Sequence, residues 1–98
     1  MEYKTYHIYL VTNKNHTVIY TGVTSALRRR IWKHKNKMYP ASFTARYNVD
    51  ELVYYEAFFD IGEAIAREKQ LKGGSRQKKF DLINNFNPEW RDLFTDLD

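Results

Sequence analysis

The sequence predicts a small α+β domain, in which a three-stranded antiparallel sheet is flanked by helices. Two segments rich in β-branched and aromatic residues lie close together near the N-terminus and indicate a hairpin. A third such segment lies in the middle of the chain, and segments with helical periodicity and capping residues separate and follow the strands. The 98 residues suffice for one core, so we expect a single domain over residues 1–98.

The hairpin is predicted to consist of strands at residues 6–12 and 17–21, joined by the polar residues 13–16. If the two strands pair symmetrically about this loop, Tyr9 lies opposite Tyr20. The two tyrosines then share one face of the sheet.

The segment after the hairpin is predicted from its turn and capping residues. Gly22 ends the second strand and offers backbone freedom there, and Ser25 can cap a helix over residues 26–37. Residues 38–49 have no clear period, so we expect an irregular segment. A third strand is predicted at residues 51–56.

Two helices are predicted in the C-terminal half, at residues 61–72 and about 75–86, followed by a short turn or helix at 88–94. Asp60 and Glu63 form a capping box for the first of these helices, and Ser75 caps the second. We expect Gly73-Gly74 to end the first helix through a residue with positive φ.

Positive charge is concentrated in the first half of the chain. The whole chain holds 16 Lys and Arg against 12 Asp and Glu, a net charge of +4. Residues 1–49 hold nine of the basic residues and a single acid. Six basic residues fall within ten positions: Arg28, Arg29, Arg30, Lys33, Lys35 and Lys37. This pattern fits a polyanionic partner, although a solvated helix face has the same composition.

Composition also excludes several classes of protein. The chain holds no cysteine, which rules out disulfides, cysteine-based zinc sites and thiol nucleophiles. No run approaches the roughly 18 apolar residues of a membrane span, and the first residues lack the pattern of a signal peptide. We therefore expect a soluble cytoplasmic protein with no membrane partner.

Three polar residues stand on helix faces that the apolar period predicts to be buried. Glu68 falls within the apolar stripe of the helix at 61–72, where a carboxylate must be paired, protonated or coordinated. His34 continues the buried face of the helix at 26–37, and Arg30 flanks it one turn earlier. Each has an ordinary explanation: a glutamate paired with a local Lys or Arg, a satisfied histidine at the core edge, and an arginine of the basic face.

If both helices cover the sheet face that carries the two tyrosines, five polar residues converge on one site: Tyr9, Tyr20, Arg30, His34 and Glu68. Such a cluster has the groups that phosphodiester hydrolysis requires. A carboxylate can hold a divalent metal, an arginine can neutralise the phosphate, and a histidine–tyrosine pair can move protons.

The order and spacing of these residues resemble the GIY-YIG nuclease family, in its small stand-alone bacterial branch. The matching residues are His7-Ile8-Tyr9, then Tyr20-Thr21-Gly22, Leu27, Arg30, His34 and Arg67-Glu68. The resemblance covers roughly residues 5–94, and the ordered set is far more specific than any one short motif. The chain departs from the family where His7 replaces a glycine and Thr21 replaces an isoleucine, and neither position supplies a catalytic group.

The resemblance implies the GIY-YIG fold and a metal-dependent endonuclease that hydrolyses DNA. Tyr9 would act as, or assist, the general base, and Tyr20 with His34 would contact the attacking water or the phosphate. Arg30 would stabilise the charge of the scissile phosphate. Glu68 would be the sole protein ligand of one Mg²⁺ or Mn²⁺ ion. The family often adds an asparagine from the last helix, for which the candidates are Asn84, Asn85 and Asn87.

The sequence defines the chemistry of the reaction more closely than it defines the substrate. The chain has no room for an appended recognition domain, so we expect selectivity for single strands or distorted structures, as in DNA repair or recombination. A homodimer or a recruiting protein partner would be another source of selectivity. The expected nucleic-acid contacts are Arg28, Arg29, Lys33, Lys35 and Lys37. RNA stays an alternative substrate.

Two other functions compete with the nuclease. One is a non-catalytic nucleic-acid-binding module that uses the basic helix, with Trp32, Tyr39, Phe43 and Tyr47 available for stacking. The other is a protein-interaction scaffold. Glu68 favours the enzyme, because without a metal a carboxylate that faces a phosphate repels it.

Overall fold

The structure is a computed structural model, and it describes residues 4–97. Its elements are, in order, β1 (Tyr6–Thr12), β2 (Ile19–Thr24), α1 (Leu27–Lys35), α2 (Phe43–Arg46), β3 (Glu51–Phe58), α3 (Ile61–Gly73), α4 (Arg76–Phe86) and the short 3₁₀ helix η1 (Leu93–Asp96). The three strands form one antiparallel sheet in the order β2-β1-β3, which confirms the predicted fold class.

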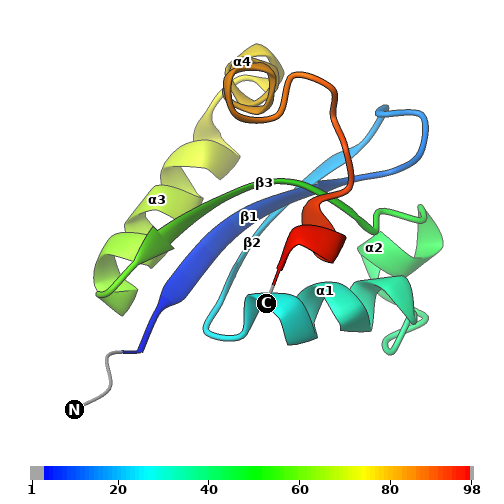
Figure 1. The fold of residues 1–98 in the computed structure, drawn as a ribbon, viewed down its shortest axis with the longest axis horizontal. Helices are drawn as coiled ribbons and strands as arrows, with labels where there is room; N and C mark the ends of the chain where they lie inside the picture. Colours follow the sequence, from blue (N-terminus) through cyan, green and yellow to red (C-terminus); the bar gives the residue numbers. More distant parts are fainter. Residues whose placement is uncertain (1–3, 98) are drawn as a thin grey trace.

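Helices cover both faces of this sheet (Figure 1). On one face, α3 and α4 pack over a core cluster of Ile8, Leu10, Val53, Tyr54, Ala64, Leu71 and Ile83. On the other face, α1 and η1 pack over Tyr9, Val11, Leu27, Ile31, Val49, Leu52 and Leu93. The condition expected from the sequence, that α1 and α3 both cover the face with the two tyrosines, is therefore not met. The physical reason lies in β1, whose residues 8–11 are all 0% exposed: a strand buried on both sides needs a cover on each.

The hairpin pairs in a different register from the symmetric prediction. Tyr9 lies opposite Gly22, and Tyr20 lies opposite Val11, so the two tyrosines do not face each other directly. They still lie on the same face of the sheet, because a shift of two residues preserves the alternation of side chains.

The side chain of Asn13 accounts for this register. Its Oδ1 accepts hydrogen bonds from the backbone N–H groups of Thr17, at 2.8 Å, and Val18, at 3.1 Å. These bonds hold the residues before Ile19 in a loop, so β2 begins two residues later than predicted and the loop is longer.

The helix ends are confirmed in part. Asp60 accepts a hydrogen bond from the N–H of Glu63, and Ser75 caps α4 as predicted. Ser25 does not cap α1: Ala26 holds that position without a side-chain bond, and its N–H donates to Thr24. The predicted positive φ at the end of α3 is also wrong, because the described glycines have none.

Two short helices differ from the prediction. The segment predicted to be irregular contains α2, which is capped by Ser42 and is too short for a hydrophobic period to show. The final segment, predicted as a turn or helix at 88–94, has a turn at residues 88–89, and the helix η1 begins only at Leu93, after Asp92 as its cap.

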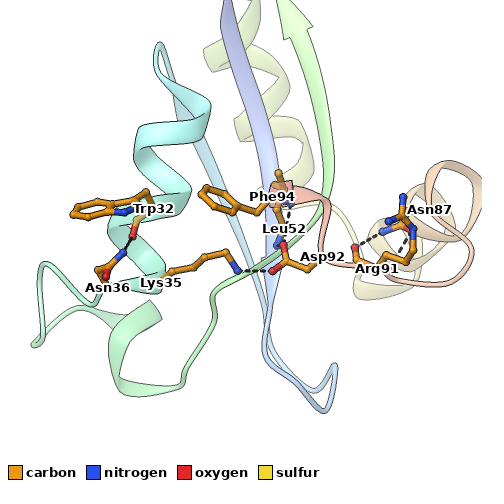
Figure 2. Close-up of polar contacts among 8 residues, drawn as sticks. All are labelled: Trp32, Lys35, Asn36, Leu52, Asn87, Arg91, Asp92 and Phe94. Carbon is orange, nitrogen blue, oxygen red and sulfur yellow. Dashed lines mark hydrogen bonds and ion pairs between the residues drawn. The ribbon is translucent and has the colours of Figure 1, made fainter. Parts of the chain in front are cut away.

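The C-terminal segment folds back beside α1 (Figure 2). The carboxylate of Asp92 accepts hydrogen bonds from the N–H groups of Leu52, at 3.2 Å, and Phe94, at 3.1 Å, and it forms an ion pair with Lys35. One carboxylate therefore ties η1 to β3 and to α1, and this holds α1 against the sheet. Within residues 4–97, no helix has the length and apolar character that crossing a membrane requires.

Candidate active site

Tyr9 stands at the centre of the candidate site, and its side chain is 0% exposed. Its ring lies across Gly22 of the edge strand β2, where an added Cβ would come within 2.3 Å of the Tyr9 Cζ and 2.4 Å of its hydroxyl. Gly22 is therefore required by the close approach of the ring, and the expected reason, backbone freedom, is wrong. The absence of a side chain there lets the Tyr9 hydroxyl lie at the edge of the sheet.

Two hydrogen bonds connect Tyr9 to α1 and, through it, to α2. The Tyr9 hydroxyl lies 3.1 Å from Nε2 of His34, and Nδ1 of His34 lies 2.9 Å from Oγ1 of Thr44. Burial, assisted by the positive charge of Arg30, lowers the pKa of His34, so its imidazole is neutral at pH 7. We assign the ring proton to Nδ1, which donates to Thr44, and this leaves Nε2 to accept from Tyr9.

The charges around Tyr9 oppose one another. The pKa of Tyr9 is raised to about 12, mainly by burial; Arg30 acts to lower it, and Tyr20 and Glu68 act to raise it. All three groups therefore lie within electrostatic reach of the Tyr9 hydroxyl. At neutral pH these surroundings keep the phenol protonated.

Arg30 and Tyr20 line a pocket of about 300 Å³ between α1 and the segment that contains α2. Arg30 is exposed, and no ion-pair partner for it occurs in the described part of the chain. The ring of Tyr20 stands edge-on to His34, with centroids 6.1 Å apart, and roughly parallel to Phe43 at 6.4 Å. The pocket therefore opens directly beside the Tyr9–His34 pair.

Glu68 reaches the site from α3, on the other face of the sheet. It lies on the inner stripe of the helix between the buried Ala64 and Leu71, and its side chain is 16% exposed. Its Oε2 lies 3.4 Å from Nζ of Lys72, which in turn lies 6.0 Å from the ring centre of Tyr20. The five predicted residues thus lie on both sides of the edge strand β2, with Lys72 between Glu68 and Tyr20, and not beneath one shared layer of helices.

Among the five residues of this site, Glu68 is the carboxylate that could hold a divalent ion. No group of three or more His, Asp or Glu that could hold a metal ion occurs within residues 4–97. A single carboxylate oxygen suits Mg²⁺ or Mn²⁺, because Mg²⁺ keeps several waters and is commonly held by one or two carboxylates together with substrate phosphates.

The basic residues of α1 and of the turn that follows it divide between two sides of the helix. Lys33 and Lys37 line the pocket beside Tyr20. Arg28 and Arg29 line a separate, larger pocket of about 780 Å³ that also contains His7. His7 therefore lies away from the Tyr9 hydroxyl.

Two of the predicted nucleic-acid contacts have partners inside the protein. Lys35 is held by the ion pair with Asp92. Arg28 donates to the backbone oxygen of Leu97 at 3.1 Å and lies over the ring of Phe94. These two basic residues stabilise the C-terminal segment against α1.

The late asparagines lie away from Tyr9. Asn84 accepts a hydrogen bond from the indole of Trp90 at 2.7 Å, and Asn85 lines a pocket on the far side of α3. Asn87 is buried and donates to the backbone oxygens of Val53 and Arg91. All three belong to the packing of α4 and the C-terminal segment.

Thr44 is the residue at the site that the sequence did not reveal. It is 5% exposed and touches His34 from α2, the helix that the prediction missed. The available signal was Ser42 two residues before it, because a serine after Pro40 can open a helix and turn the next residues inward.

Comparison with known proteins places these residues in a family. A family model described as the GIY-YIG catalytic domain matches residues 5–81. The UPF0213 protein SSP2268 of Staphylococcus saprophyticus is 39% identical over 79 residues, which are 81% of this chain and 94% of that protein. A UPF0213 protein of Haloquadratum walsbyi is 31% identical over 77 residues, 79% of this chain and 85% of that one.

A solved structure agrees with the sequence matches. The solution NMR structure of the UPF0213 protein BH0048 of Bacillus halodurans superimposes with a TM-score of 0.57 at 30% identity, over 90% of this chain and 92% of that chain. The matched segment 5–81 contains both tyrosines, Arg30, His34 and Glu68, the residues that the fold gathers at the β2 edge. The chain therefore belongs to the GIY-YIG family of nuclease domains.

Proposed function

We propose that this protein is a divalent-metal-dependent endonuclease that hydrolyses DNA phosphodiester bonds, with a preference for single-stranded or distorted DNA. The observation that carries the proposal is the surroundings of Tyr9. A buried tyrosine hydroxyl contacts a neutral histidine, while an exposed arginine and a mostly buried glutamate lie within electrostatic reach of it.

In the proposed reaction, water attacks the phosphorus atom. A new P–O bond forms, the bond between phosphorus and the sugar oxygen of the leaving strand breaks, and that oxygen takes a proton from solvent water. Tyr9, as the phenolate, takes a proton from the attacking water. Its own proton leaves first, to Nε2 of His34 and from there to solvent through the pocket that His34 lines.

Arg30 and Glu68 serve the phosphate in this scheme. The guanidinium of Arg30 can donate two hydrogen bonds to phosphate oxygens and offsets the charge that develops on them. A Mg²⁺ or Mn²⁺ ion held by Glu68 would supply a second positive charge to offset the same developing charge. Lys72 is 51% exposed at its side chain, so it can turn to solvent when a cation binds Glu68.

The Glu68–Lys72 ion pair supports a second candidate, a nucleic-acid-binding module without cleavage. A carboxylate that is neutralised by a lysine does not repel phosphate, so the site could hold a strand without cutting it. In that case the basic α1 would do the binding, and a homodimer or a recruited protein would supply any further activity.

A cleavage assay with Glu68→Gln separates the two candidates. Purified protein would be incubated with single-stranded, duplex, nicked, flapped and branched DNA, in Mg²⁺, in Mn²⁺ and in chelator. We expect metal-dependent cutting by the wild type, and a loss of roughly 10³-fold or more in the variant with DNA binding nearly unchanged. Preference for flapped or branched DNA would favour a role in repair or recombination.

The matched control is Glu63→Gln, which removes an exposed glutamate from the first turn of the same helix. It should cut as the wild type does. Binding by the wild type and by both variants, with no cutting in either metal, would contradict the nuclease and support the binding module.

A further inference from the structure

The pocket beside Tyr20 has an aromatic wall. Phe43 of α2 is 48% exposed and stands between Tyr20, with centroids 6.4 Å apart, and Tyr47 at 4.8 Å. Tyr39, across the same pocket, is 65% exposed. Aromatic side chains are usually covered in a domain of this size, so rings left open around a pocket indicate a surface for a flat ligand.

The pocket is also positively charged. Arg30, Lys33 and Lys37 line it, and no Asp or Glu is among the described residues that do so. Lys37 donates to the amide oxygen of Asn48 at 2.7 Å, a neutral partner that leaves its charge uncompensated. An anionic group attached to a flat, stacking group fits this lining, and a nucleotide has both.

From this lining we propose that the pocket binds one unstacked nucleotide of a DNA strand, next to the scissile phosphate, with its base stacked on Phe43. This inference rests on the proposed function, because it takes Arg30 and His34 as the position of the phosphate. Both residues line the pocket themselves, so a nucleotide in it adjoins the reacting group.

The size of the pocket restricts what can enter. Its volume of about 300 Å³ is at the lower end of ligand sites, which suits one base and not a base pair. A base inside a duplex is stacked on its neighbours and must be unpaired before it can turn outward. The pocket thus gives a physical reason for selectivity toward single-stranded or frayed DNA.

Binding measurements with Phe43→Leu test this proposal without relying on cleavage. The parent protein in these measurements is the Glu68→Gln variant, and Phe43→Leu is introduced into it. The labelled ligands are a single strand, a hairpin duplex of the same sequence, and single strands with one abasic nucleotide at each position in turn. We expect Phe43→Leu to weaken single-strand binding about tenfold and to change duplex binding by less than about twofold. An abasic nucleotide at one position should weaken binding by the parent protein by a similar factor, and it should not change binding by Phe43→Leu.

Two matched variants control for packing. Phe86→Leu removes a ring that is also 48% exposed and also contacts two tyrosines, but it lies on α4, so binding should not change. Phe43→Tyr keeps the ring and should keep both the affinity and the abasic effect. The melting temperature of each variant shows whether it is folded.

Three outcomes would overturn the proposal. Equal losses for single-stranded and duplex DNA in Phe43→Leu would mean that Phe43 only holds α2 in place. If an abasic nucleotide still weakens binding by Phe43→Leu, the base binds elsewhere. Tighter binding of RNA of the same sequence would overturn the assignment to DNA. Binding as expected, with no cutting by the wild type, would leave this pocket in place and contradict only the nuclease.

Discussion

Within residues 4–97, two clusters each contain a tyrosine, a glutamate and an arginine, and they are arranged in opposite ways. In the first, Tyr54, Glu56 and Arg67 join β3 to α3. Arg67 donates to both oxygens of Glu56 at 2.9 to 3.3 Å, and the hydroxyl of Tyr54 donates to the same carboxylate. Every charge in this cluster is compensated by another member of it.

The second cluster, around Tyr9, leaves its charges apart. Arg30 and Glu68 come from helices on opposite faces of the sheet, and they form no ion pair with each other within residues 4–97. The hydroxyl of Tyr9 contacts His34 instead of a carboxylate. The same three side-chain types therefore build a closed structural ion pair in one place. In the other, the arginine has no ion-pair partner within residues 4–97, and the carboxylate is paired with Lys72, whose side chain is 51% exposed.

Replacement of the arginine in each cluster by lysine should give the largest difference between the two clusters. Replacing Arg30 by Lys should lower the cleavage rate roughly 100-fold with an unchanged melting temperature, because lysine lacks the planar fork that contacts two phosphate oxygens. Replacing Arg67 by Lys should lower the free energy of unfolding by about 1 kcal/mol and change the cleavage rate by less than about threefold. Cleavage kinetics and thermal melts of both variants check this. Equal rate losses would mean that the two clusters do not differ in function.

The pH dependence of cleavage tests the role of Tyr9. Burial raises its pKa to about 12, so few molecules carry the phenolate at pH 7. If the phenolate is the base, the rate should rise from pH 7 to pH 9, by up to about tenfold per pH unit. Below neutrality the rate should fall further as His34, whose pKa burial lowers below 6.5, gains a proton and stops accepting from Tyr9. A rate that declines from pH 7 to pH 9 would rule out Tyr9 as the base.

Thr44→Val tests whether the second cluster, around Tyr9, depends on a positioned histidine. We call this the open cluster, and the cluster of Tyr54, Glu56 and Arg67 the closed cluster. The change removes the partner of Nδ1 on His34, and we expect the maximal rate to fall about tenfold with little change in KM. Because the removed bond fixes the tautomer, the acid limb of the pH profile should also shift. Thr44→Ser keeps the hydroxyl and should restore both. An unchanged pH profile in Thr44→Val would limit Thr44 to a packing role.

The closed and open clusters also differ in how far the sequence predicted them. Glu68, His34 and Arg30 could be found, because each breaks the apolar period of a helix or fits a motif spacing. The place where these residues come together could not be predicted from the sequence. It depends on the hairpin register that Asn13 fixes and on the packing of helices on both faces of the sheet.

Local signals did not suffice for two further residues. Thr44 lies on a helix of four residues, which has too few turns to show a period. Glu56 looked like an ordinary strand residue, because its partner Arg67 is brought to it only by the packing of α3 on β3. Residues that act through such distant contacts become visible only in the folded chain.

The pH dependence of stability tests the closed cluster, and it is the prediction with the smallest expected effect. Burial by itself would raise the pKa of Glu56, but the hydrogen bonds from Arg67 and Tyr54 and the charge of Arg67 outweigh it and lower that pKa below 4.5. A carboxyl whose pKa is lowered on folding stabilises the protein above its unfolded pKa, and this stabilisation is lost as the pH falls through the folded pKa.

Glu56→Gln should therefore lower the free energy of unfolding by about 1 to 2 kcal/mol at pH 6 to 8, a modest value because both partners are about one-quarter exposed, at 26% and 25%. The difference from the wild type should shrink as the pH falls below about 4.5. Denaturant titrations at several pH values measure it, with Glu63→Gln as the control that keeps the wild-type profile. A difference that stays constant down to pH 3 would show that Glu56 stabilises the fold by packing, and the contrast between the two clusters would then lose its electrostatic basis.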